Sequence, residues 1–321
     1  MMKKELGIFI LLIILCVVVA AINPKFVNSA NLQNMARLVG MFGIFSIGIG
    51  IVIITGGIDL SVGSVFALLG VLLSQMLMEW HWPSALAVLA VIALTMLLGA
   101  LHGFLITKVN IQPFIVTLCG LLFYRGAARF IAHDETKGFG GEESGFETLR
   151  TLATGSVLGI PMPFILLIVI AAIMWVVLHR SIYGRYLYAV GRNEEAARYS
   201  GINSRRVIAS AYILSGGLAG VAGVLIAFYT NSVSPSSHGN FYELYGIAAA
   251  VLGGCSLRGG EGSIIGILIG ATLLQVLQNL VNLLGIPSSL NFAVMGAVIL
   301  LGVVADQILK RRAARSRTAR A

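Results

Sequence analysis

The chain has 321 residues, of which 58% are hydrophobic and 11% charged, and its formal net charge is +9. Soluble domains carry about 25% charged residues, and the apolar residues here come in blocks as long as a membrane-spanning helix, so an ordinary soluble protein is excluded. The basic residues lie in short segments beside the apolar blocks, as the positive-inside rule predicts, which argues against a nucleic-acid partner. We therefore expect an all-α, polytopic integral membrane protein, because helices satisfy their own backbone hydrogen bonds in lipid.

The apolar blocks predict about ten transmembrane helices in a single membrane domain over residues 1–309, followed by a basic tail at 310–321. The first block is long for a signal peptide, so we expect an uncleaved helix there. The predicted spans cover approximately residues 6–22, 38–54, 62–79, 84–107, 112–131, 161–178, 207–229, 243–257, 263–284 and 290–309.

The distribution of basic residues predicts the orientation. With the N-terminus in the cytoplasm, sixteen Lys and Arg residues fall in inner segments and four in outer segments. Both termini are therefore expected to be cytoplasmic. Two connections are long, an outer one at about 132–160 and an inner one at about 179–206. The tail at 310–321 is interpreted as an orientation signal that lies against anionic membrane lipid.

The stretch TGGIDLSVGS, residues 55–64, places a carboxylate between the second and third predicted spans. Gly56 and Gly57 are expected to end the second helix. Asp59 or Ser61 can then cap the third helix by accepting hydrogen bonds from its free N–H groups. The count of spans puts this stretch at the inner surface, so Asp59 need not lie deep in lipid.

The inner connection contains NEEAARYSGI, which has the features of a short helix. Asn193 can cap it, Glu194 and Glu195 suit its positive end, and Arg198 follows Glu194 by four residues. Gly201 can then end it. The spacing leaves open whether this helix is a solvated linker or a docking element for a cytoplasmic partner.

The ninth predicted span carries two patterns. Gly262, Gly266 and Gly270 repeat every four residues, which lets a neighbouring helix approach closely. Four amides share one helical face, and they must face inward because lipid cannot pair them. Either they make hydrogen bonds between helices, or they form a polar wall along a pathway for a hydroxylated solute; they are Gln275, Gln278, Asn279 and Asn282.

Two arginines, Arg125 and Arg129, lie four residues apart in the outer half of the fifth predicted span. Arginine at this depth is costly unless it reaches the interface or a partner. One interpretation is that both side chains extend to the outer surface. The other is that they bind the acidic outer connection or a partner docked there.

Four stretches resemble the carbohydrate-uptake ABC permeases of the ribose-permease type, which include galactose, xylose and arabinose relatives. They are TGGIDLSVGS, QPFIVTLCGLLFYRGAAR (112–129), YAVGRNEEAARYSGINSRRVIASAYILSGGLAGVAG in and after the inner connection, and AAAVLGGCSLRGGEGSIIG (248–266). Together they extend over about residues 48–270. The combination is far more specific than any one of them alone.

The resemblance implies a pore made with a second permease copy or homologue, a separate cytoplasmic ATPase and an extracytoplasmic sugar-binding protein. It implies that Asn193, Glu194, Glu195, Arg198 and Gly201 form the coupling helix that contacts the ATPase. It also raises the possibility that Asp59 and Ser61 lie at a broken helix in the gate, which is compatible with a cap. One position departs from the family pattern, because Tyr245 stands where a second acid often follows the position of Glu243.

The chain is expected to perform no catalysis and to need no cofactor or metal. It contains no Gly-Lys pair and hence no phosphate-binding GxxxxGK motif. The expected function is a permease subunit for a monosaccharide such as ribose. Two alternatives remain: an ABC permease for a branched-chain amino acid or nucleoside, and an ion-coupled transporter. The latter is disfavoured because nearly every charge is predicted at the end of a span.

Overall fold

The computed structural model describes residues 2–140 and 146–287 and a few separate positions between 290 and 300, with side chains from Leu6 onward. Almost all of this is helical. The helices are α1 (Met2–Ile22), α2 (Ser29–Ile54), α3 (Val62–Ser74), α4 (Ser84–Thr107), α5 (Pro113–Ala132), α6 (Glu147–Thr154), α7 (Met162–His179), α8 (Ile182–Arg192), α9 (Glu194–Tyr199), α10 (Ser204–Thr230), α11 (Tyr242–Leu252) and α12 (Ile264–Leu283).

Short elements complete the described chain. A 3₁₀ turn (Pro24–Val27) precedes α2, and a π-helical turn (Gln75–Glu79) extends α3. Strand β1 (Lys137–Gly138) pairs antiparallel with β4 (Ser232–Val233), with Lys137 opposite Val233. Strand β2 (Ser156–Val157) pairs antiparallel with β3 (Ile160–Pro161), with Val157 opposite Ile160.

Seven helical segments are long and apolar enough to cross a membrane, and they confirm seven of the predicted spans. They are Ser29–Ile54, Val62–Glu79, Ser84–Thr107, Pro113–Ala132, Met162–His179, Ser204–Thr230 and Ile264–Leu283. The first predicted span corresponds to a shorter apolar stretch, Leu6–Ile22. The tenth, and the basic tail, lie outside the described residues apart from isolated positions.

The eighth predicted span is wrong as a complete crossing. Helix α11 has 11 residues, and at 1.5 Å per residue it reaches about 16 Å, about half of the hydrocarbon core. It ends at a glycine pair, and Gly254 takes the left-handed conformation with φ +93°. The apolar run continues past this pair in the sequence, but the helix does not.

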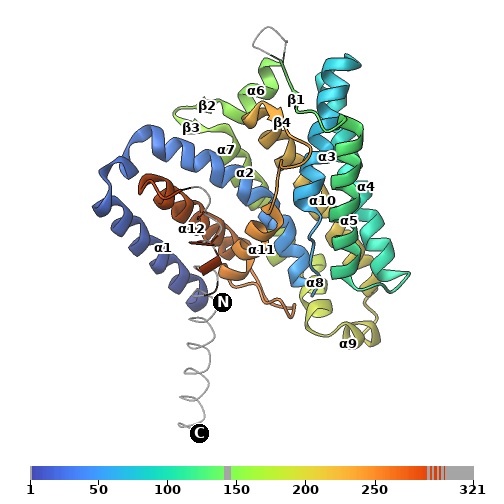
Figure 1. Cartoon of the computed structure of the whole chain (residues 1–321). Helices are drawn as coiled ribbons and strands as arrows, with labels where there is room; N and C mark the ends of the chain where they lie inside the picture. Colours follow the sequence, from blue (N-terminus) through green and yellow to red (C-terminus); the bar gives the residue numbers. More distant parts are fainter. Residues whose placement is uncertain are drawn as a thin grey trace, which may run out of the picture.

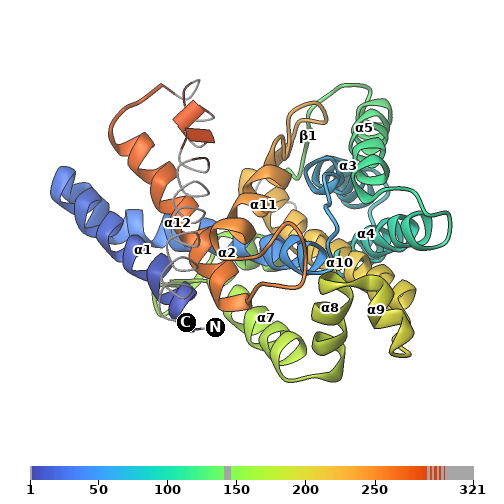
Figure 2. The ribbon, with the colours of Figure 1, turned by 90° about the horizontal axis from the view of Figure 1, so that it is seen from below.

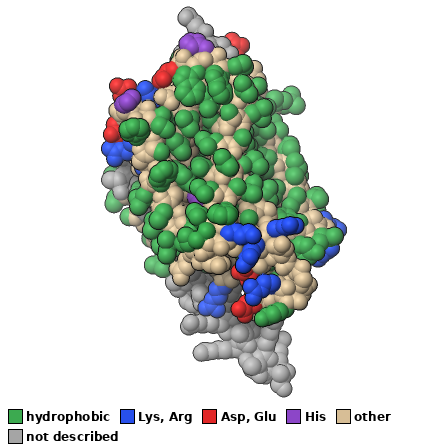
Figure 3. All heavy atoms as spheres, turned by 90° about the vertical axis from the view of Figure 1, so that its right-hand side faces the viewer, with side chains coloured by type: hydrophobic (Ala, Val, Ile, Leu, Met, Phe, Trp, Pro, Cys, Tyr) green, Lys and Arg blue, Asp and Glu red, His purple; other side chains and the backbone are tan. Residues whose placement is uncertain are grey.

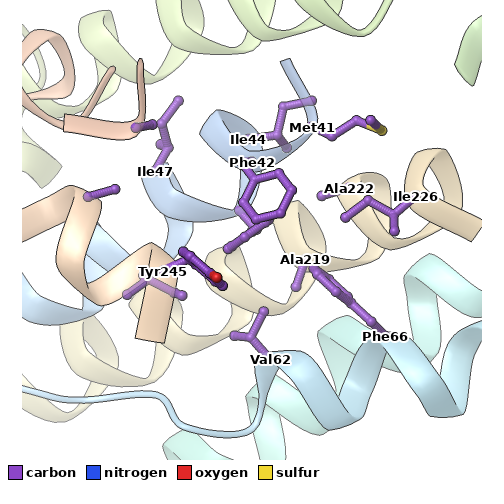
Figure 4. Close-up of a cluster of buried hydrophobic side chains, with 14 of the residues drawn as sticks. Met41, Phe42, Ile44, Ile47, Val62, Phe66, Ala219, Ala222, Ile226 and Tyr245 are labelled. Atoms are coloured by element: carbon purple, nitrogen blue, oxygen red, sulfur yellow. The ribbon is translucent and has the colours of Figure 1, made fainter. Parts of the chain in front are cut away.

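Helix α2 lies at the centre of the molecule, between α1 and α12 on one side and α3, α4 and α5 on the other (Figures 1 and 2). Every residue from Val39 to Ile54 is buried. This helix packs against α7, α10, α11 and α12. Figure 4 shows side chains of α2, α3, α10 and α11 meeting in one hydrophobic cluster, in which Phe42, Phe66 and Tyr245 supply aromatic rings.

Helices α4 and α5 expose most of their apolar side chains. Only 22% and 28% of their most apolar windows are buried, and Figure 3 shows a broad hydrophobic face on this side of the molecule. Basic side chains gather at one end of that face (Figure 3), the end that carries α8 and α9 in Figure 1. This arrangement is that of a polytopic membrane protein, with apolar surface toward lipid and charge at the ends of the helices.

Candidate functional site

The predicted helix break after α2 is confirmed, and the chain then turns inward. Helix α2 ends at Ile54, and Gly56 is left-handed with φ +85°. Residues 57–61 form no helix. The carbonyl of Ile58 accepts hydrogen bonds from the Tyr212 hydroxyl at 3.2 Å and the Thr117 hydroxyl at 3.3 Å. We call residues 55–61 the re-entrant segment.

Asp59 lies inside the helix bundle, away from the surface of the protein. Its side chain is 4% exposed. Its Oδ2 accepts a 3.4 Å hydrogen bond from Ser215, near the middle of the 27-residue helix α10. A few extended residues, at about 3.3 Å each, suffice to carry Asp59 this far from the end of α2.

The capping prediction is also wrong in detail. Ser61 occupies the N-cap position of α3, but its side chain makes no capping bond. Instead, Asp59 Oδ1 accepts from the Ser61 N–H at 3.0 Å and from the Ser61 hydroxyl at 2.7 Å. Asp59 therefore holds Ser61, the residue just before the first turn of α3, and it lies close to the positive end of that helix.

A small cavity lies beside Asp59, with room for about one water molecule. Its polar lining comes from Asp59, Ser61, Thr95 and His102. His102 is 2% exposed, and its Nε2 lies 2.8 Å from the Tyr124 hydroxyl. Sequence reasoning missed His102, because its neighbours come from α3, α5 and α10 and no local spacing signals them.

Arg125 is half-buried and is the centre of a second polar cluster. Its guanidinium donates to the carbonyls of Pro235 at 3.1 Å and His238 at 2.8 Å, and to that of Gly63 at 3.3 Å. Both sequence interpretations of Arg125 are therefore wrong. It binds backbone carbonyls inside the molecule and ties the segment before α11 to the first turn of α3.

Arg129 behaves as one of those interpretations predicted, because it binds the acidic connection that follows α5. Its Nε lies 2.6 Å from Asp134 Oδ1, and both side chains are exposed. The hydrogen bonds from Arg129 hold the pKa of Asp134 below its usual range.

Glu243 is 6% exposed and lies against Gly63. A Cβ at Gly63 would overlap both the Glu243 carboxylate and the carbonyl oxygen of Gly239, so the starts of α3 and α11 meet backbone to backbone. Asp59 and Glu243 are thus buried carboxylates beside the ends of helices, with Arg125 half-buried between α3 and the segment before α11. Tyr245, at the position where an acid is often found, packs edge-on against Phe42 with ring centroids 5.9 Å apart.

The predicted short helix of the inner connection is confirmed as α9. Asn193 Oδ1 accepts from the Ala196 N–H at 2.9 Å. Gly201 follows with φ +83°, and its N–H donates to the carbonyl of Arg198 at 3.0 Å. Glu195 and Arg198 are exposed, whereas Glu194 accepts from the Ser204 hydroxyl at 3.0 Å and so ties α9 to α10.

Helix α8, which the sequence analysis missed, connects α9 to the end of α2. Its buried side chains include Leu187 and Val190, an i, i+3 pattern that a periodicity search can detect. A Cβ at Gly191 would overlap the carbonyl of Ile54, and the Gly260 N–H donates to the same carbonyl at 2.9 Å. We call this contact of Ile54, Gly191, Gly259 and Gly260 the α2–α8 junction.

The glycine pattern of the ninth span is confirmed for two of its three members. Cβ atoms at Gly266 and Gly270 would overlap the carbonyls of Gly253 and Ala249, so α12 and α11 pack with their backbones in contact. Gly262 precedes α12 and belongs to the preceding loop, where its φ is +157°.

The four amides share a face of α12 but not one environment. Gln275 is 3% exposed, Gln278 and Asn279 are half-buried, and Asn282 is exposed. Asn279 and Asn31 of α2 exchange two hydrogen bonds, of 2.8 and 3.1 Å. For Asn279, this pair supports the first interpretation, in which the amides make hydrogen bonds between helices. None of the four amides lines the cavity beside Asp59.

A double-mutant cycle tests the Asn31–Asn279 pair. Replacing either residue by alanine should lower the free energy of unfolding by about 1 kcal/mol, because the other, half-buried amide loses the hydrogen bonds of the pair. The double variant should cost less than the sum of the two, with a coupling of about 0.6–2 kcal/mol. Thermal unfolding in detergent measures these differences, and additive costs would contradict the pairing.

The comparisons with known proteins agree with this architecture. A family model described as "Branched-chain amino acid transport system / permease component" matches residues 31–303. The chain is 40% identical to the ribose import permease protein RbsC of Bacillus subtilis, over 95% of this chain and 93% of that one. It is 32% identical to the fructose import permease protein FrcC of Rhizobium meliloti, over 90% and 81%.

A third relative is the D-allose transport system permease protein AlsC of Escherichia coli, 31% identical over 95% of this chain and 92% of that one. No solved structure matches the chain. The family model matches most of the chain and the relatives nearly all of it, and seven of the described helices are long and apolar enough to cross a membrane. The chain therefore belongs to this family of membrane permeases, as a non-catalytic, multi-pass permease subunit of an ABC transporter in the cell membrane.

Proposed function

We propose that this chain carries a monosaccharide such as ribose across the cytoplasmic membrane, as the permease subunit of an ATP-driven importer. The names of three relatives, which import ribose, fructose and D-allose, support a sugar as the cargo. The observation that carries the mechanism is the connection from α9 through the α2–α8 junction to the re-entrant segment.

In the proposed assembly a separate ATPase binds α9, and a soluble sugar-binding protein docks at the opposite end, near β1–β4 and α6. A second permease copy or homologue completes the pore, and both termini lie in the cytoplasm. ATP-driven movement of α9 displaces α8, and the α2–α8 junction passes this displacement to the residues that precede Asp59. The spans then open alternately to the two sides of the membrane.

Uptake by cells tests the cargo. Cells that lack this chain should lose uptake of labelled ribose and regain it from a plasmid copy, while uptake of labelled leucine is unchanged. Loss of leucine uptake with normal ribose uptake would instead favour the amino-acid alternative. Loss of uptake on collapse of the proton gradient, with ATP held constant, would favour an ion-coupled transporter.

Charge reversal on α9 tests the coupling. The double variant Glu195→Arg and Arg198→Glu should lower ribose uptake about tenfold or more, because misplaced like charges across an interface cost several kcal/mol. Both side chains are exposed, so the amount of folded protein in the membrane should not change. The control is Lys108→Glu, at an exposed position just after α4. Equal uptake by the two variants would refute a coupling role for α9.

A further inference from the structure

Asp59 has hydrogen-bond partners but no counter-ion. Its carboxylate accepts from the Ser61 N–H and hydroxyl and from Ser215. Within the described part of the chain, no ion pair involves it. The positive end of α3 stabilises a carboxylate nearby but is not a counter-ion. A carboxylate without a counter-ion is costly inside a membrane protein.

The other charged and titratable groups near the re-entrant segment do not supply the missing charge. Arg125 and Glu243 meet at Gly63, so their charges offset each other. Burial, followed by the positive charge of Arg125, lowers the pKa of His238 to about 4, so this imidazole is neutral at pH 7. The remaining titratable groups are the phenols Tyr124 and Tyr212, which carry no charge, and His102.

His102 is placed to exchange a proton with Asp59. Both side chains line the same cavity, which has room for about one water molecule. An imidazole ring can accept and release a proton, and a single water can bridge two groups that do not touch. The bond from His102 Nε2 to Tyr124 anchors the ring on the α5 side.

We propose that Asp59 binds an exchangeable proton, with His102 across the water-sized cavity as the group through which the proton enters and leaves. On loading, an N–H bond of the imidazolium breaks and an O–H bond forms on Asp59 by way of the bridging water, so that both side chains end neutral. Unloading is the reverse.

Proton loading changes how the re-entrant segment is held. A neutral carboxyl accepts hydrogen bonds more weakly than a carboxylate, so the long bond from Ser215 weakens first. Loading therefore loosens the re-entrant segment from α10, the helix that begins beyond α9 in the chain. This link to the transport cycle rests on the proposed function, whereas proton binding by itself does not.

Infrared difference spectroscopy of the purified full chain in nanodiscs tests the proposal without sugar, ATP or partner proteins. Lowering the pH protonates the exposed carboxylates as well, so the tested signal is the part of the carbonyl stretching band that wild type shows and Asp59→Asn lacks. This part of the band should be present in Glu243→Gln, the matched variant of another buried carboxylate. In His102→Gln this part of the band should appear about tenfold or more slowly after a pH jump, because the exchanging group is gone.

Several outcomes overturn the proposal. They are a band that is the same in Asp59→Asn as in wild type, and an Asp59-dependent part of the band that vanishes in Glu243→Gln. Replacing choline chloride by sodium chloride at fixed pH should leave this part of the band unchanged. Its suppression by sodium would show that the site binds a metal cation instead of a proton. Where Asp59→Asn fails to fold, Asp59→Glu takes its place and should shift this part of the band in frequency; an unshifted band overturns the proposal.

Discussion

Replacing Arg125 by methionine is expected to lower the free energy of unfolding by about 1–3 kcal/mol, because the acceptors of a half-buried polar cluster lose their charged donor. Three carbonyls, of Pro235, His238 and Gly63, lose their donor. Glu243, against the same Gly63, loses the positive charge that offsets its own. Since these carbonyls come from the start of α3 and from the segment before α11, both elements lose a common support.

Arg129→Met is the matched control, one helical turn along α5. Arg129 is exposed, and its partner Asp134 is exposed as well. Exposed ion pairs contribute about 0–1 kcal/mol, so this variant should remain close to wild type. Thermal unfolding followed by size-exclusion chromatography measures both. Equal losses for the two arginines would contradict the structural role of Arg125.

Replacing Gly191 by alanine should disrupt the α2–α8 junction. The new methyl group would overlap the carbonyl of Ile54 and the N–H of Gly260. Neither backbone can rotate away as a side chain does, so overpacking should cost about 1–3 kcal/mol. Because α8 must move away from α2, sugar uptake should fall much further than the amount of folded protein does.

The measurement is uptake per folded molecule, together with ATP hydrolysis by the assembled importer. Hydrolysis should continue in Gly191→Ala while uptake is lost, since α9 itself is unchanged. Gly126→Ala is the control, because a Cβ at that position meets no atom within 4 Å. It should match or slightly exceed wild-type stability. Parallel loss of hydrolysis and uptake in Gly191→Ala would show that the junction does not transmit movement.

The sequence was sufficient to predict the long helices and the ends of α9. An apolar block of about 20 residues, such as Ser84–Thr107, predicts a membrane span by its length and composition alone. The capping side chain of Asn193 and the left-handed Gly201 act within a few residues of the helix that they bound. Such features depend only on neighbouring residues, so they can be recognised in the sequence alone.

The depth of Asp59 and the partners of Arg125 were not predictable in this way. Both depend on contacts between residues far apart in the chain, such as Asp59 with Ser215 and Arg125 with His238. The number of apolar residues in the segment of α11 also predicts a full span, because hydrophobicity alone does not reveal that a glycine pair ends the helix. Long-range pairing of buried polar groups is therefore what the structure adds.

The α2–α8 junction has a consequence for how importers of this kind diverge. It is made from glycines and a carbonyl, with no side chain to vary, so substitutions cannot adjust it in small steps. A lineage that acquires a new cargo can keep this joint unchanged and alter its amides and aromatic rings independently. The drive mechanism and the choice of solute can then evolve as separate traits on one scaffold.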